Sequence, residues 1–192
     1  MKKIRSICVF CASSQSIDRV YQEAATDLGR RMGQAGIDLV YGGASIGSMG
    51  CVARGVHQGG GQVVGILPEF FMKKDIEYSE ADELIVTKDM RERKAIMDQR
   101  SDAFIVLPGG IGTLEEAAEI LSMKLLRLTR KPLVFVNTQN FFDLLIGHFK
   151  KTIDQKFAKP DIVNLFSVET DPENALRYIL NYEPEKVESK WQ

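Results

Sequence analysis

The sequence AFIVLPGGIGTLEE, at residues 103–116, constrains the fold of this chain most strongly. It begins with a short continuous apolar run, which is typical of a parallel strand covered on both faces. Pro108 has no N–H to donate to a strand ladder, so we expect the strand to end there. The glycines that follow allow a sharp turn, and Thr113 with Glu116 three residues later matches a capping box. The stretch therefore predicts a buried strand, a glycine turn and the start of a helix.

The rest of the chain repeats this alternation of strand and helix. We expect strands at residues 4–11, 38–41, 62–67, 83–87, 103–107, 132–137 and 162–168, and helices at 18–34, 49–58, 89–101, 113–128, 141–157 and 171–180. Residues 69–81 are charged and irregular, and we expect a surface loop with one helical turn beside the cleft. The alternation predicts an α/β domain over residues 1–182, with a Rossmann-like, doubly wound, mostly parallel sheet of about seven strands. We expect the polar tail, residues 183–192, to be disordered.

Composition excludes several classes of protein. The 192 residues are 44% hydrophobic and 27% charged, as in globular domains, and the formal net charge of −1 gives no general attraction to nucleic acid or anionic membranes. No apolar run approaches the roughly 20 residues of a membrane span. The start, MKKIRSICVF, resembles a signal peptide, but Arg5 and Ser6 interrupt its apolar run, so we interpret it as the first strand. We therefore expect a cytoplasmic protein.

The cysteines and histidines offer little material for a metal site. Cys8 and Cys11 form a CxxC pattern, but they lie in a predicted strand, where residues three apart face opposite ways, and no second pair completes a zinc site. Small buried thiols are the better interpretation. The chain has only two histidines, so we expect no histidine-based metal site or serine triad.

A second glycine-rich turn, GGASIGSMG at residues 42–50, follows the second predicted strand. In open parallel sheets ligands bind outside the carboxyl ends of the strands, and both glycine turns lie at that edge. A helix N-terminus there favours a phosphate. The turns match neither a P-loop, because GK[ST] is missing, nor the dinucleotide fingerprint, whose third glycine would stand at Glu115. We expect a phosphate-bearing ligand of nucleotide size; packing alone is the alternative.

Two groups of charged residues have competing interpretations. Glu116 fits the capping box, but a carboxylate beside a phosphate site could also stabilise an oxocarbenium-like sugar or position water. Arg91, Arg93 and Lys94 open a helix, where positive charge is unfavourable without an anionic partner. They form either a solvated face or one edge of the cleft.

The motifs PGGIGTLEE and MRERK together match PGGxGTxxE and M-(H/R)-x-R-K, and the chain thus resembles the LONELY GUY family of cytokinin riboside monophosphate phosphoribohydrolases. Further matches are AATDLG at residues 24–29, VYGGASIGSMG at 40–50 and GILP at 65–68. The resemblance implies a homodimer or larger assembly that hydrolyses the N-glycosidic bond of an adenine-type nucleoside 5′-monophosphate without a metal or organic cofactor. A nucleic acid or membrane partner is not expected.

The resemblance also assigns roles to residues. It implies that Arg93 and Glu116 are catalytic and that the phosphate and the rest of the nucleotide contact Ser13, Ser14, Gly42, Gly43, Lys94, Gly109, Gly110, Gly112 and Thr113. Residues 122–127 read SMKLLR, where plant-like members carry a Thr-Trp-x-Gln-Leu-Gly run. Activity on a purine monophosphate is therefore a firmer expectation than a preference for prenylated adenine. A non-catalytic nucleotide-binding or sensor protein on the same fold is the alternative.

Overall fold

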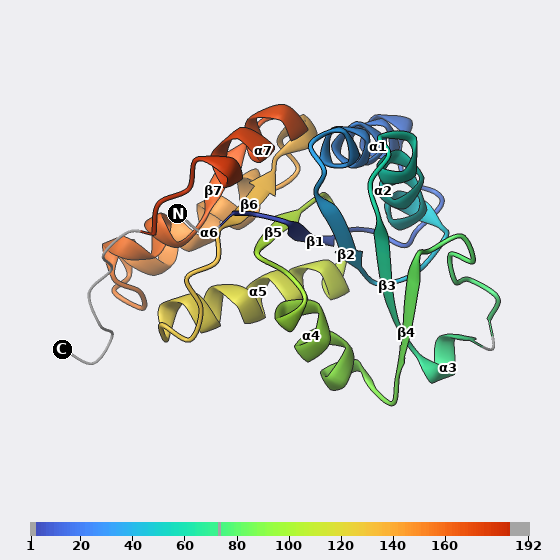
Figure 1. The fold of residues 1–192 in the computed structure, drawn as a ribbon. Helices are drawn as coiled ribbons and strands as arrows, with labels where there is room; N and C mark the ends of the chain where they lie inside the picture. The colour runs from blue at the N-terminus through green and yellow to red at the C-terminus, as the bar shows by residue number, and fades with distance from the viewer. Residues whose placement is uncertain (1–2, 73, 185–192) are drawn as a thin grey trace.

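A computed structural model describes residues 3–72 and 74–184 of the chain. Its centre is a seven-stranded sheet in the order β4-β3-β2-β1-β5-β6-β7, in which every neighbouring pair is parallel (Figure 1). The strands are β1 Ser6–Phe10, β2 Asp38–Tyr41, β3 Val63–Pro68, β4 Glu83–Thr87, β5 Ala103–Val106, β6 Leu133–Val136 and β7 Ser167–Glu169. The predicted Rossmann-like α/β domain is confirmed, and its sheet is parallel throughout.

Helices cover both faces of the sheet, which gives three layers (Figure 1). One face carries α1 Arg19–Gln34, α2 Gly47–Gln58 and α7 Pro172–Leu180, and the other carries α4 Met90–Gln99, α5 Ile111–Leu125 and α6 Asp143–Asp154. The short helix α3 Glu69–Met72 follows β3 at the edge, and 3-10 turns occur at Thr138–Asn140 and Pro160–Leu165. None of the described helices has the length and hydropathy of a membrane span.

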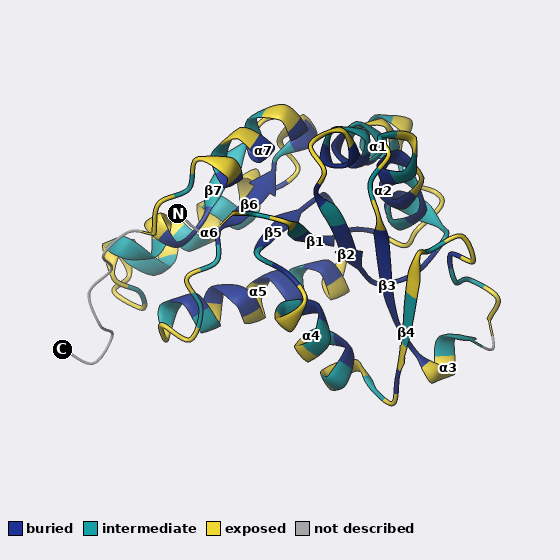
Figure 2. Cartoon of the chain, in the orientation of Figure 1, coloured by how far each residue is buried: buried dark blue, intermediate teal, exposed yellow. Residues whose placement is uncertain are grey.

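The alternation of side chains along β1 explains the two cores. Ile7 and Val9 face the layer of α1, α2 and α7, whereas Cys8 and Phe10 face the layer of α4, α5 and α6. Both faces of the central strands are buried, as their continuous apolar sequences predict (Figure 2). Cys8 and Cys11 are free and buried, which confirms the interpretation of the CxxC pattern as packing.

Several predicted boundaries are wrong, and one of them changes the site. Helix α5 begins at Ile111 with Gly110 as its N-cap and has no side-chain cap, so Thr113 and Glu116 do not form the predicted capping box. A glycine N-cap carries no side-chain signal, whereas the hydroxyl of Thr113 resembles a preferred cap, so the sequence pattern predicts a start that is too late. Residues 162–165, predicted as the start of the seventh strand, belong instead to the 3-10 helix Pro160–Leu165, since Pro160 favours a turn start, and β7 begins only at Ser167. The predicted disordered tail lies almost wholly in residues 185–192, outside the described chain.

Candidate active site

A cavity of about 450 Å³ lies at the carboxyl end of the sheet, beside the point where the strand order reverses between β1 and β5. This reversal is the switch point at which open parallel sheets bind ligands, because the loops after the two strands diverge there. The segments after β1, β2 and β5 and the starts of α4 and α5 line the cavity. The topology thus gathers segments that are about a hundred residues apart in the sequence.

The β5–α5 turn forms one wall of the cavity. Gly110, Ile111, Gly112 and Thr113 line it, and Gly110 and Gly112 are exposed. The first intrahelical bond of α5 runs from the amide of Leu114 to the carbonyl of Gly110, so the amides of residues 111–113 lie at the open end of the helix. A helix N-terminus with open amides attracts an anion. Gly109 lies behind this wall, where a Cβ would come within 2.2 Å of the Thr113 hydroxyl.

The β2–α2 turn forms the opposite wall. Gly42 lines the cavity, and a Cβ there would lie 1.9 Å from Nη2 of Arg93, so this glycine leaves the space that the guanidinium fills. Gly43 has a φ of +78°, which favours glycine, and its carbonyl accepts a hydrogen bond from the amide of Tyr78. Ser13 and Ser14, in the segment after β1, complete this side of the cavity.

Arg93 and Glu116 meet at the base of the cavity as a buried ion pair. Nη1 of Arg93 donates to Oε1 of Glu116 over 3.0 Å, and Nε donates to the carbonyl of Ile66 on β3 over 3.0 Å. The Arg93 and Glu116 residues are only 5% and 6% exposed. Because the guanidinium is bonded at both Nε and Nη1, its orientation is fixed. The Glu116 carboxylate therefore binds Arg93 rather than capping α5.

Burial governs the electrostatics of the pair. Removal from water raises the pKa of Glu116 above its ordinary value, and the positive charge of Arg93 acts in the opposite direction. Two opposing effects therefore act on the pKa of the Glu116 carboxyl group, which lies beside an open cavity. Such a group can hold or release a proton close to bound ligand, which is the property expected of a catalytic carboxylate.

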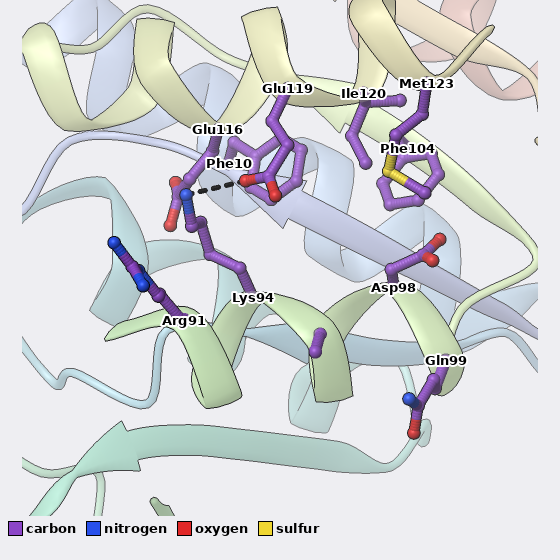
Figure 3. Close-up of a pocket in the computed structure, with 11 residues that line it drawn as sticks. Phe10, Arg91, Lys94, Asp98, Gln99, Phe104, Glu116, Glu119, Ile120 and Met123 are labelled. Carbon is purple, nitrogen blue, oxygen red and sulfur yellow. Dashed lines mark ion pairs between the residues drawn. The ribbon is translucent and has the colours of Figure 1, made fainter. Parts of the chain in front are cut away.

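Lys94 does not line this cavity; its side chain extends toward Glu119 of α5 in a second hollow between α4 and α5 (Figure 3). This hollow measures about 210 Å³, and Arg91 and Glu116 also line it. Nζ of Lys94 forms ion pairs with Glu115 and, over 2.6 Å, with Glu119. Burial acts to lower the pKa of Lys94, but the two carboxylates outweigh burial and raise it. The lysine is therefore engaged in joining the two helices.

The structure brings together most of the predicted site residues. Those that line the main cavity are Ser13, Ser14, Gly42, Arg93, Gly110, Gly112, Thr113 and Glu116. Three do not line it: Gly43 and Gly109 support its walls from behind, and Lys94 faces the second hollow. Sequence reasoning missed the apolar wall, which includes Met49, Phe71, Ile76 and Met90. A single apolar side chain in a turn carries no functional signal, although the loop of Phe71 and Ile76 was expected beside the cleft.

The fold and the cavity define a Rossmann-like protein with a switch-point site, and comparison with known proteins narrows this class. A family model described as "Possible lysine decarboxylase" matches residues 49–179. The chain is 38% identical over 190 residues, 98% of its length and 78% of the relative's, to "Probable cytokinin riboside 5'-monophosphate phosphoribohydrolase LOGL2" of Oryza sativa subsp. japonica. It is 39% identical to "Cytokinin riboside 5'-monophosphate phosphoribohydrolase LOG3" of Arabidopsis thaliana, over 98% of this chain and 88% of that protein. The chain therefore belongs to the LOG family.

Solved structures extend the likeness of the fold. The molybdenum cofactor carrier protein of Chlamydomonas reinhardtii superposes with a TM-score of 0.71 at 25% identity, over 92% of this chain and 96% of that one. DNA processing protein A of Helicobacter pylori superposes with a TM-score of 0.54 at 13% identity, over 94% of this chain and 83% of that one. At 13% identity, the likeness to DNA processing protein A shows a similar fold and nothing about function.

Proposed function

We propose that this protein hydrolyses the N-glycosidic bond of an adenine-type nucleoside 5′-monophosphate to free base and ribose 5-phosphate. The observation that carries the proposal is the buried Arg93–Glu116 pair at the base of a cavity that the N-terminus of α5 enters. The relatives, which are named as phosphoribohydrolases that act on cytokinin riboside 5'-monophosphate, support the same chemistry. The proposed substrate class includes N6-modified adenine nucleotides.

The 5′-phosphate binds at the N-terminus of α5, against the amides of residues 111–113. Thr113 and Gly112 line this position, and the partial positive charge of the helix end stabilises the anion. Glu116 lies five residues further along the same helix than Ile111, about 7.5 Å along its axis. One helix thus presents an anion site at its end and a carboxylate one turn further on, which suits a phosphate and the sugar carbon joined to it.

Glu116 acts on the ribose. As the bond between C1′ and the base nitrogen breaks, its electron pair leaves with the base, which takes up a proton, and positive charge develops on C1′ and the ring oxygen. The ionised carboxylate stabilises this charge and orients a water, which adds its oxygen to C1′ and loses a proton. Arg93 holds the carboxylate in place and contributes positive charge toward the nucleotide.

The apolar wall suits the base. Phe71, Met49 and Met90 offer an aromatic ring and two polarisable thioethers to a planar ring, which stacking and dispersion favour. This wall lies in the same cavity as Glu116, so a nucleotide can reach both. The wall carries few hydrogen-bonding groups, so contact with the base is mainly apolar.

A second candidate is a nucleotide-binding or carrier protein without catalysis. The likeness to a molybdenum cofactor carrier protein favours this class. Phosphate binding alone, however, gives no reason to bury a carboxylate and a guanidinium at the cavity base. A pyridoxal-dependent decarboxylase is a poorer fit, because no lysine of the described chain lines the main cavity.

The test is a base-release screen of the purified protein with purine and pyrimidine 5′-monophosphates, with the corresponding nucleosides as controls. We expect release from AMP or isopentenyladenosine monophosphate and little from nucleosides, since these lack the phosphate. Equal cleavage of nucleosides would contradict the phosphate site, and tight binding without turnover across the set would favour the carrier. A homodimer or larger assembly and a cytoplasmic location complete the proposal; sedimentation of the purified protein tests the first.

A further inference from the structure

A hydrogen-bond network outside the main cavity joins the end of α2 to the segment that precedes β4. Nε2 of His57 lies 3.0 Å from Oδ2 of Asp82, and its Nδ1 lies 3.0 Å from the hydroxyl of Tyr78. The same Asp82 oxygen accepts the amide of Val63 over 2.8 Å, and the Tyr78 hydroxyl donates to Glu80 over 3.1 Å. None of these residues belongs to the proposed catalytic machinery.

This network is continuous with a wall of the main cavity. The segment of residues 76–78 pairs with the β2–α2 turn through an isolated antiparallel bridge between Ala44 and Glu77. The amide of Ser45 donates to the carbonyl of Ile76 over 2.7 Å, and the amide of Tyr78 donates to the carbonyl of Gly43 over 2.9 Å. We call these two bonds the clamp. Ile76 lines the cavity, and Gly42, next to the clamp, is the residue against which Arg93 packs.

The protons in the network can be counted. Hydrogen bonds from His57 and from the amide of Val63 lower the pKa of Asp82, so its carboxylate is ionised and Nε2 must donate. Burial, assisted by Glu80, raises the pKa of Tyr78 to about 12, so the phenol keeps its one proton. The phenol donates that proton to Glu80, and Nδ1 must then donate to the phenol oxygen. All contacts are satisfied only when both ring nitrogens of His57 carry protons.

With a neutral ring, the same contacts conflict. The single Tyr78 proton then serves either Glu80 or Nδ1, and the other contact has no hydrogen. The charged and titratable groups that act on this network are Asp82, Glu80 and Tyr78 on the segment, Arg54 on α2, which acts on Tyr78, and Asp38 on β2, whose pKa is raised by burial and by Asp82. Arg54 also donates to the carbonyl of Ser45, so it holds the same turn from the other side. Loss of either contact of His57 therefore weakens the attachment of the segment to α2.

We propose that His57 is a positioning group, which holds the segment of residues 76–82 against the β2–α2 turn and thereby fixes the Ile76 wall of the cavity. The inference rests on the proposed function in so far as the cavity binds a nucleoside monophosphate. It implies that nucleotide affinity falls when the contacts of His57 with Tyr78 and Asp82 are removed. Chemistry at Glu116 is unaffected, because His57 touches neither Glu116 nor the cavity.

The first arm of the test needs no ligand. Hydrogen exchange of the Ser45 and Tyr78 amides is followed at pH 6 in the parent protein, in His57→Gln, and in Tyr78→Phe, which keeps the ring and the clamp amide. We expect both amides to exchange about tenfold faster in the two variants, as expected when one hydrogen bond of support is lost. His148→Gln, which changes the other histidine on the exposed side of α6, is the matched control and leaves exchange unchanged. Unchanged exchange in both test variants would overturn the proposal.

The second arm measures AMP affinity by calorimetry at pH 6 in a Glu116→Gln background, and kcat and KM in the active protein. We expect Kd to be about tenfold higher in the His57→Gln and Tyr78→Phe proteins than in the parent, and to be unchanged in the His148→Gln control. KM follows Kd while kcat changes less than about twofold. Faster exchange with unaltered affinity would overturn the positioning role. No AMP binding by the parent would overturn the proposed function and this role with it, whereas the exchange arm still reports on the clamp.

Discussion

Two cations of α4, Arg93 and Lys94, form ion pairs with carboxylates of α5, and the chemistry differs because the Arg93 pair is buried whereas the partners of Lys94 are exposed. Arg93 and Glu116 are about 95% covered, and the guanidinium is held by a second bond to the sheet. Lys94 stands next to Arg93 in the sequence, but its partners Glu115 and Glu119 have side chains that are 53% and 43% exposed. Because neighbouring residues of a helix point in different directions, Arg93 lines the cavity and Lys94 lines the outer hollow.

The difference in burial separates the Arg93–Glu116 pair, which is available for chemistry, from the ion pairs of Lys94, which add to stability. An exposed ion pair gains little because water screens it and long side chains lose freedom. A buried pair must repay the loss of hydration of both ions, so it is costly to build and costly to break. The raised pKa of Glu116 records that cost. A fold that only needed to join α4 to α5 could do so with the ion pairs of Lys94 alone.

The largest expected effect is on turnover when the inner carboxylate is removed. Glu116→Gln keeps the size and an acceptor for Arg93, but it carries no negative charge to stabilise the ribosyl cation. We expect kcat to fall by about 10²–10⁴ with little change in AMP affinity. Glu119→Gln on the same helix is the control, and its kcat should stay within about twofold of the parent. Unchanged base release by Glu116→Gln would remove the catalytic role.

The second effect is on stability and contrasts the two cations directly. Arg93→Met leaves the Glu116 carboxylate buried without its partner, and we expect the free energy of unfolding to fall by about 3 kcal/mol. Lys94→Met breaks only the outer pairs, and its loss should stay below about 1 kcal/mol. Urea denaturation of both variants at neutral pH measures the difference. Equal losses would show that burial does not distinguish the pairs.

The third prediction tests whether activity depends on the fixed position of Arg93. A Cβ at residue 42 would lie 1.9 Å from Nη2 of Arg93, and the guanidinium is tied to Ile66 and Glu116, so it can move aside only by losing a bond. We expect Gly42→Ala to lower kcat/KM by roughly tenfold to a hundredfold. Gly147→Ala is the matched control, because that position on α6 has open space for a methyl group. Activity of Gly42→Ala equal to that of the control would contradict this packing argument.

Sequence reasoning predicted the part of the molecule that depends on local pattern. The apolar runs and glycine turns were sufficient for the order of strands and helices, and the two glycine turns indicated the edge of the sheet at which the cavity lies. The start of α5 was misplaced by two residues, because a glycine cap gives no side-chain signal, and the misplacement created the false capping box of Thr113 and Glu116. Which of Arg91, Arg93 and Lys94 enters the cavity depends on how α4 is rotated against β3, and that rotation is a tertiary property.

The network of His57 shows a second limit of the same kind. Its members come from α2, the segment before β4 and the first residue of β3, and no spacing along the chain relates them. A lone histidine carries little functional signal in a sequence, since most such residues are at the surface or packed in the core. Only the three-dimensional placement of Tyr78, Glu80 and Asp82 around it reveals the demand for two protons on one ring.

The smallest expected effect is electrostatic: the charges of Lys94 and Glu115 act on the pKa of the buried Glu116. Glu116 must be ionised to stabilise a cation, so kcat should rise with pH as the carboxyl loses its proton, with a midpoint above 4.5 because burial raises the pKa. The positive charge of Lys94 acts to lower that pKa, and the negative charge of Glu115 acts to raise it. Lys94→Met removes the first influence, so the acid limb of kcat should move a few tenths of a pH unit upward, and Glu115→Gln should move it downward. Profiles measured at low ionic strength resolve such shifts best, because salt screens the exposed charges. Shifts of the same sign in both variants would show that structural displacement, and not charge, couples the two pairs.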